Sequence, residues 1–262
     1  MPLARLADVE IHYETVGAGP PLLLVSGLGG NASYWKPNLD ALAAHHTVIT
    51  HDHRGTGGST RFDGAYSVEL LAQDMLGLMD VLGIDSAAII GHSTGGAIGQ
   101  ILAAEAPARV GRLMLYASWG AGDPQMEQCL RLRQRALALG GTLDYHRASP
   151  VFLYPPRYVR EHWSMIESEI MAADRATTTP AILDARLEAI LAFDGRPYHA
   201  RMTSPTRILV AEDDILTPPY LSADLATAIA GSTLRQLPYG GHAVSRTDPV
   251  AFLHEVEDFL AR

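Results

Sequence analysis

One serine in this sequence stands in a setting that favours nucleophilic chemistry. Residues 91–95 read Gly-His-Ser-Thr-Gly, a G-x-S-x-G pattern centred on Ser93. The apolar run 87–90 precedes the pattern, and a stretch with helical spacing follows it and stops at Pro107. A strand, a sharp turn and a helix in this order form a nucleophile elbow, which holds a serine hydroxyl clear of the sheet. We therefore predict that Ser93 is a nucleophile.

Glycines surround this serine, and the elbow explains them. Strand and helix backbones pass close to each other at such a turn, so the neighbouring residues must be small. Gly91, Gly95 and Gly96 satisfy that need. An ordinary glycine-rich turn is the alternative interpretation, and the five residues alone do not distinguish the two.

A serine hydroxyl is a poor nucleophile at neutral pH and needs a base, which in turn needs a group to orient it. The candidate orienting group lies in residues 211–218, Ala-Glu-Asp-Asp-Ile-Leu-Thr-Pro, directly after the apolar run 208–210. We predict that Asp214 has this role. Asp213 and Glu212 remain candidates, because spacing does not exclude a neighbour, and a solvated acidic turn is the alternative.

The candidate base follows the next predicted strand, 234–237. Residues 239–243 read Tyr-Gly-Gly-His-Ala, and the two glycines free the backbone to bring the imidazole of His242 toward the serine. The chain order serine, acid, histidine is the order that a nucleophile elbow requires. We therefore predict that His242 is the base.

The same chemistry needs two backbone N–H groups that stabilise an oxyanion. One is predicted to come from Thr94, which follows the nucleophile. The other is predicted to come from residues 26–30, Ser-Gly-Leu-Gly-Gly, after the apolar run 22–25, and Leu28 is our candidate because it follows the first glycine. This chemistry requires no metal and no organic cofactor.

The elements that must position these residues alternate along the chain. Short apolar runs predict buried strands, and the longer periodic stretches between them predict covering helices. The strands are expected at 22–25, 47–50, 87–90, 113–116, 208–210 and 234–237, with an antiparallel edge strand at 9–13. The pattern predicts an α/β fold, a doubly wound and mostly parallel sheet.

The alternation stops between residues 119 and 199, where helical spacing dominates, as in 126–139 and 182–191. We interpret this segment as a helical cap inserted into a core formed by residues 1–118 and 200–262. Such a cap would lie above the carboxyl ends of the strands, where open α/β sheets bind ligands.

Three arginines recur in the predicted cap, at Arg131, Arg133 and Arg135. A solvated basic face is the default interpretation. The alternative is that Arg133 or Arg135 reaches down to a substrate carboxylate, since arginine forms bidentate pairs with such groups. Tyr154 and Trp163 would then line the substrate site, although packing within the cap explains them equally well.

Two other motifs suggest different chemistry. Residues 27–32 fit G-x-G-x-x-A after an early strand, and Asp52 follows about 25 residues on, as in dinucleotide-binding folds. That interpretation leaves the serine elbow, the acidic loop and the Gly-Gly-His turn unexplained. His51-Asp52-His53 resembles a cluster of metal ligands, but alternate residues at a strand end converge poorly on one ion, so we predict no metal site.

The composition limits the partners. The formal net charge of −9 and the scattered basic residues argue against nucleic acid. The single cysteine, Cys129, cannot form an internal disulfide, and the first residues show no apolar secretion signal. No apolar stretch approaches the roughly 20 residues that span a bilayer. We expect a soluble cytoplasmic protein that binds a small-molecule substrate and does not bind a membrane. The sequence leaves the oligomeric state open, and a homodimer is one option.

Several segments together resemble the α/β-hydrolase superfamily along the whole chain. They are residues 26–30 with Ser33-Tyr34-Trp35, His53-Arg54-Gly55-Thr56-Gly57, the elbow at 91–95, Asp214, and residues 239–243. Within the superfamily, the chain is similar to the aminoacrylate hydrolases of pyrimidine degradation, a subgroup also discussed as acting on carbamate. That similarity rests on residues 129–141 with Arg133, Arg135 and Gly140-Gly141, on Phe152-Leu153-Tyr154-Pro155, and on Thr247-Asp248-Pro249.

The resemblance implies a small, polar, anionic substrate with a C–N or related bond, and it favours Arg133 as a substrate ligand. Some members of the subgroup lack serine at the elbow, whereas this chain has Ser93, which favours an acyl-enzyme. Enol-lactonases and carboxylesterases share the same frame. The leading hypothesis is therefore a serine hydrolase, and the others are an acid-base catalyst that forms no acyl-enzyme and a ligand receptor with an inactive triad.

Overall fold

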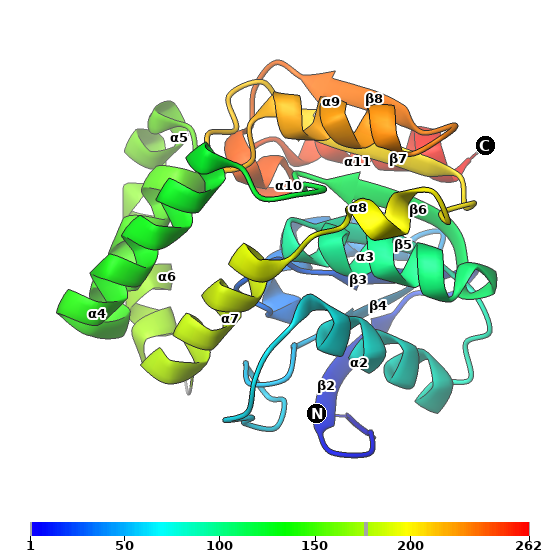
Figure 1. Cartoon of the computed structure of the whole chain (residues 1–262), viewed down its shortest axis with the longest axis horizontal. Coiled ribbons are helices and arrows are strands. Elements are labelled where there is room, and N and C mark those ends of the chain that lie inside the picture. Colours follow the sequence, from blue (N-terminus) through cyan, green and yellow to red (C-terminus); the bar gives the residue numbers. More distant parts are fainter. Residues whose placement is uncertain (1, 176–177, 262) are drawn as a thin grey trace.

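The computed structural model describes residues 2–175 and 178–261. Within these residues eight strands form one sheet in the order β1-β2-β4-β3-β5-β6-β7-β8 (Figure 1). The strands are β1 (Leu3–Arg5), β2 (Glu10–Val16), β3 (Pro21–Val25), β4 (Thr47–His51), β5 (Ala87–His92), β6 (Val110–Tyr116), β7 (Thr206–Ala211) and β8 (Thr233–Leu237). The strands from β4 to β8 in this order run parallel, and β1 and β2 pair antiparallel. The predicted fold class is confirmed, and β1 was not predicted because it is only three residues long.

Helices connect and cover the strands. Their bounds are η1 (Ala32–Asn38), α1 (Leu39–Ala43), α2 (Val68–Val81), α3 (Thr94–Glu105), η2 (Pro107–Arg109), α4 (Pro124–Leu153), α5 (Pro156–Glu161), α6 (Trp163–Asp174), α7 (Pro180–Ala192), α8 (Arg196–His199), α9 (Pro219–Ala228), η3 (Gly241–Ala243), α10 (Val244–Thr247) and α11 (Pro249–Leu260). Proline at the first turn and a capping side chain start several of them: Asp123 before α4, Thr179 before α7 and Asp248 before α11.

Burial on both faces explains why the central strand β3 is almost continuously apolar. In β3, Leu23 and Val25 join a cluster with residues of α2 and α3, whereas Leu22 and Leu24 join a second cluster with residues of η1 and α11. Successive side chains of a strand point to opposite faces, so a sheet covered on both sides buries every position. The helices on both faces therefore hold the strands in place, and with them the carboxyl ends of the strands.

Between β6 and β7, helices α4 to α7, here called the cap helices, lie together at one end of the sheet (Figure 1). The predicted helix 126–139 is part of the longer α4, which Gly141 interrupts with a φ of 70°. The last helix of this connection, α8, returns to the core, where His199 Nε2 lies 2.9 Å from Gln100 Oε1 of α3. The division into a core of 1–118 with 200–262 and a cap of 119–199 stays a proposal.

In the described part of the chain, no helix combines the length and the apolar character that a membrane span requires.

A buried ion pair between the loop after β4 and helix α2 gives a test of this packing. Arg54 Nε donates to Asp74 Oδ2 at 2.7 Å, and both side chains are buried. Without Asp74, the buried Arg54 keeps only Asp8 as a partner, and that carboxylate is more than half exposed, so Asp74→Asn is expected to lower the free energy of unfolding by about 3 kcal/mol in urea titrations. Asp80, on the same helix, pairs with Arg109 at the surface, and Asp80→Asn is expected to cost less than about 1 kcal/mol. An equal decrease in the free energy of unfolding of the two variants would contradict this packing.

Candidate active site

Ser93 lies at the sharp turn between β5 and α3. Its φ of 54° and ψ of −114° are unusual for a residue with a side chain. The turn is held by a hydrogen bond from Ser93 N–H to the carbonyl of Tyr116 at 2.8 Å and by one from Ser118 Oγ to the carbonyl of Ser93 at 2.9 Å. A Cβ on Gly91 or on Gly95 would collide with backbone carbonyl groups, which explains both glycines. The elbow expected from the sequence is therefore present.

Asp214 and His242 meet at the carboxyl ends of the neighbouring strands β7 and β8. His242 Nδ1 lies 2.9 Å from Asp214 Oδ2, and both residues are buried. Asp214 Oδ1 accepts from the N–H groups of Leu216 and Thr217 at 2.9 Å each, and its Oδ2 accepts from Thr217 Oγ1 at 2.8 Å. These hydrogen bonds fix the position of the carboxyl group. The carboxylate orients the imidazole and leaves Nε2 as the nitrogen available to Ser93.

The two other acids of the loop have different positions. Asp213 Oδ1 accepts from the backbone N–H of Gly241 at 2.7 Å, so this side chain anchors the Gly-Gly-His turn instead of the imidazole. Glu212 is exposed. Of the three candidate acids, Asp214 is the one that contacts His242.

His92, inside the elbow, packs against the turn that carries His242. Its Nε2 donates to the carbonyl of His242 at 2.8 Å, and its ring stacks on Tyr34 with centroids 4.6 Å apart. Burial and the neighbouring His242 keep the pKa of His92 well below its ordinary value. His92 is therefore neutral and holds the turn that carries His242 in place.

The two predicted oxyanion donors flank Ser93. Thr94 is the first residue of α3, and the first N–H groups of a helix have no acceptor within it. Leu28 lies in a turn closed by the hydrogen bond from Gly30 N–H to Gly27 O at 2.9 Å, which does not use the Leu28 N–H. This turn approaches the nucleophile closely, because a Cβ on Gly27 would lie 3.1 Å from Ser93 Cβ.

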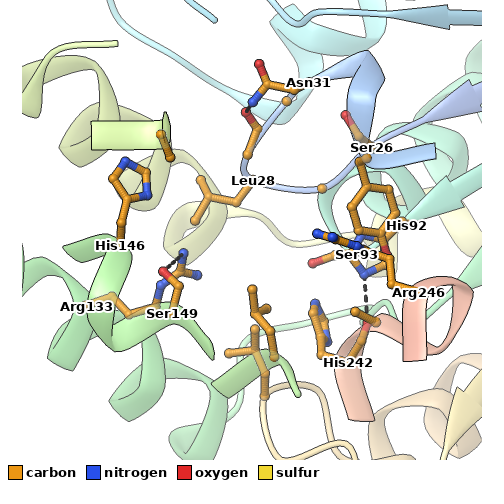
Figure 2. A pocket seen from close by; sticks show the side chains of 18 of the residues that line it. Ser26, Leu28, Asn31, His92, Ser93, Arg133, His146, Ser149, His242 and Arg246 are labelled. Carbon is orange, nitrogen blue, oxygen red and sulfur yellow. Dashed lines mark hydrogen bonds between the residues drawn. The ribbon is translucent and has the colours of Figure 1, made fainter. Parts of the chain in front are cut away.

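A cavity of about 570 Å³ opens above these residues, and its lining includes Ser93, His242 and Leu28. Figure 2 shows Ser93 and His242 on one side of it and Arg133 with His146 and Ser149 on the other. The cap helices α4 and α6 supply much of the far wall. The cavity thus lies between the cap helices and the carboxyl ends of the strands.

Charge in the lining is mainly positive. Among the described lining residues the basic ones are Lys36, Arg133 and Arg246, and Glu169 is acidic. Glu169 pairs with Arg246, whose guanidinium also donates to Tyr154 Oη at 3.0 Å. Lys36 is the only lysine of the sequence, in a protein with a net charge of −9. The cavity is therefore suited to an anion.

Arg133 is a buried cation without a carboxylate partner among the described residues. It is 5% exposed, and its Nη2 donates to Tyr145 Oη at 2.7 Å and to Ser149 Oγ at 3.1 Å. Its Nε has no hydrogen-bond partner, and within the described residues none of the ion pairs involves it. A buried arginine with free donors at the wall of a cavity is suited to bind a carboxylate.

Two predicted substrate contacts need correction. Arg135 is exposed and Trp163 is 45% exposed, and neither lines the cavity. Arg133 and Arg135 are two residues apart on a helix, which puts them on different faces. Trp163 begins α6 and points outward. Tyr154 does line the cavity, and Arg131 lies on the surface, where it pairs with Glu188.

Sequence analysis missed several residues around the site, among them Arg246, Lys36, His146 and Arg186. Arg246 follows His242 by four residues, and this spacing could have indicated it. Arg186 repeats in phase with Ile182 and Ile190 on the buried face of α7, so a cation on an apolar face was the available signal.

The residues of the two alternative motifs, the dinucleotide-like pattern with Asp52 and the cluster His51-Asp52-His53, make structural contacts in their loops. Asp52 accepts hydrogen bonds from the N–H groups of Ala32 and Gly58 at 2.8 Å each, so its carboxylate is already used. The rings of His51 and His53 stack with centroids 5.0 Å apart. Among the described residues, no group of three or more His, Cys, Asp or Glu side chains could hold a metal ion.

Known proteins with similar sequences cover nearly the whole chain. Residues 20–147 match the family described as alpha/beta hydrolase fold. A protein of Azorhizobium caulinodans, provisionally named carbamate hydrolase RutD, is 41% identical over 96% of this chain and 95% of its own length. A protein of Variovorax paradoxus with the same provisional name is 38% identical over 97% of each chain.

Solved structures agree with this result. The enol-lactonase from Burkholderia xenovorans superposes with a TM-score of 0.91 and 29% identity over the full length of both chains. A hydrolase from Pseudomonas aeruginosa superposes with a TM-score of 0.90 and 27% identity over 100% of this chain and 98% of its own. The resemblance noted in the sequence is thereby confirmed: this chain is a hydrolase that belongs to the α/β-hydrolase family.

Proposed function

We propose that the protein hydrolyses a small carboxylate-bearing acyl compound through a triad of Ser93, His242 and Asp214. The observation that carries the proposal is the Asp214–His242 contact at 2.9 Å beside the strained Ser93, in the wall of one cavity. The buried acid holds the imidazole in the tautomer that carries a proton on Nδ1, so that Nε2 accepts the serine proton.

The reaction proceeds in two halves. Ser93 Oγ bonds to the substrate carbonyl carbon as His242 Nε2 takes its proton, and the carbonyl electron pair moves to oxygen. The N–H groups of Leu28 and Thr94 donate to this oxyanion. When the carbonyl re-forms, the leaving group departs with the proton from His242. Water, deprotonated by His242, then attacks the acyl-enzyme and releases the acid and Ser93.

The charge of the cavity supports an anionic substrate. Arg133, opposite Ser93 in the cavity, would bind a carboxylate that is remote from the reacting carbonyl (Figure 2). The relatives provisionally named carbamate hydrolases, together with the resemblance to aminoacrylate hydrolases, support an aminoacrylate-like or carbamate-like compound with a C–N bond. Such a substrate is a small molecule and needs neither nucleic acid nor a membrane; a cytoplasmic location and a homodimer stay predictions.

The size of the cavity favours a second candidate, an ester or enol-lactone that carries a distal carboxylate. A volume of about 570 Å³ lies within the range of about 300–1,000 Å³ that holds drug-sized ligands, and carbamate has a single carbon. The neighbour named as an enol-lactonase supports this candidate. Both candidates use the same triad and the same arginine.

The role of Ser93 is tested with p-nitrophenyl acetate. Ser93→Ala removes the nucleophile, and kcat is expected to fall by at least about 10³-fold. Thermal melting should stay close to that of the wild type, because the hydroxyl faces the cavity. Turnover retained by a folded Ser93→Ala variant would contradict the nucleophilic role and favour acid-base catalysis without an acyl-enzyme.

The role of Arg133 is tested with two esters of similar shape, monomethyl succinate and methyl 4-methylpentanoate. The wild type is expected to prefer the carboxylate, and Arg133→Met should reduce that preference by about 10-fold to 100-fold in kcat/KM, as expected for one charged hydrogen bond. Arg135→Met is the matched control, since Arg135 is exposed on the same helix and should leave the preference unchanged. A wild type that prefers the neutral ester would exclude this role.

A further inference from the structure

Arg186, on cap helix α7, reaches out of the cap to the loop that carries Leu28. It is 2% exposed, and its Nη2 and Nε donate to the carbonyl of Leu28 at 2.8 Å and 3.2 Å. Its Nη1 donates to the carbonyl of Arg54 at 3.2 Å, and Nη2 lies 3.0 Å from His53 Nδ1. Every acceptor of this cation is therefore neutral.

The charge of Arg186 is not neutralised by its surroundings. None of the ion pairs within the described residues involves Arg186. Burial lowers the pKa of Arg186 to about 10, so the side chain remains a cation at neutral pH. An isolated buried charge is costly, and such a group persists only where other interactions offset its cost.

The loop has the shape that this guanidinium requires. Gly30 has a φ of +68°, and a Cβ there would lie 2.7 Å from Arg186 Nη2, so glycine leaves room for the arginine. Arg186, Leu28 and Thr94 also line one small cavity beside the main one. The guanidinium thus lies beside both proposed oxyanion donors, outside the lining of the substrate cavity.

We propose that Arg186 is a positioning residue that completes the oxyanion hole from the cap. The Leu28 N–H shares a peptide plane with the Gly27 carbonyl, which accepts from Gly30 N–H, and the Leu28 carbonyl belongs to the next plane, which Arg186 holds. With both planes held, rotation about the Leu28 Cα is restricted, and the direction of the N–H is restricted with it. The positive charge also favours negative charge on the substrate oxygen, since it lies in a poorly solvated place. This inference rests on the proposed serine hydrolase function, and it makes the oxyanion hole dependent on the docking of α7.

The test compares Arg186→Met with the wild type in turnover of p-nitrophenyl acetate and in inhibition by phenylboronic acid, which forms a tetrahedral adduct on serine. Loss of one oxyanion contact is expected to lower kcat about 100-fold with little change in KM. Affinity for the boronate should fall by a similar factor. Arg186→Lys, which keeps the charge but not the forked donors, should recover part of both losses.

A merely structural role predicts a different pattern. Arg207 is another buried arginine, bonded to Glu255 away from the cavity, and Arg207→Lys should lower thermal stability while kcat and boronate affinity stay unchanged. If Arg186→Met behaves in the same way, the proposal is wrong. If Arg186→Met does not fold, Gly30→Ala takes its place, because the added methyl group pushes the loop off the guanidinium. Gly30→Ala must then lower both kcat and the affinity for the boronate by similar factors. If it does not, the proposal is wrong. Turnover by Ser93→Ala would instead refute the proposed function, whatever Arg186 does.

Discussion

The contact between the carboxylate of Asp214 and the imidazole of His242 is the interaction on which the rest of the site depends. Both groups are buried, so each must be satisfied by partners that the fold supplies. The loop after β7 provides two N–H groups and one hydroxyl to Asp214, and Asp213 in the same loop binds the turn that carries His242. The imidazole is thereby held through its Nδ1 and through its backbone, and His242 lines the same cavity as Ser93.

The sheet brings these loops together. Strands β7 and β8 are parallel neighbours, β6 separates β7 from β5, and the loops after β5, β7 and β8 all leave from the carboxyl ends. Ser93, Asp214 and His242 therefore lie at the same edge of the sheet although they are far apart in the sequence. His92 at the end of β5 and Tyr116 at the end of β6 hold the turn that carries His242, because both side chains donate a hydrogen bond to the carbonyl of His242.

Sequence analysis could predict the sheet and the order of the reacting residues, because apolar runs and turn residues are local features. It could not choose among Asp214, Asp213 and Glu212, since the choice depends on how the loop after β7 meets the loop after β8. It also extended the substrate site to Arg135, because the face that α4 turns to the cavity depends on the docking of the cap. For Arg186, the sequence could show a cation on the apolar face of α7 but not its role, because that role depends on the carbonyls of Leu28 and Arg54, which leave no pattern in a sequence.

Cap and core contribute different parts of the proposed reaction. The core supplies the nucleophile, the base and the orienting acid, while α4 supplies Arg133 and α7 supplies Arg186. A change in the cap can therefore alter the choice of substrate through Arg133 or the rate of reaction through Arg186. This separation is consistent with one fold serving several reactions.

The central claim is that Ser93 attacks the substrate and that Asp214 and His242 activate it. The most direct measurement is the intact mass and peptide map of the protein after treatment with a fluorophosphonate. The account predicts one phosphonyl group on the peptide that contains Ser93 in the wild type, formed much more slowly in His242→Ala and in Asp214→Asn. Ester turnover that continues in the treated wild type, with no phosphonyl group on that peptide, would contradict it.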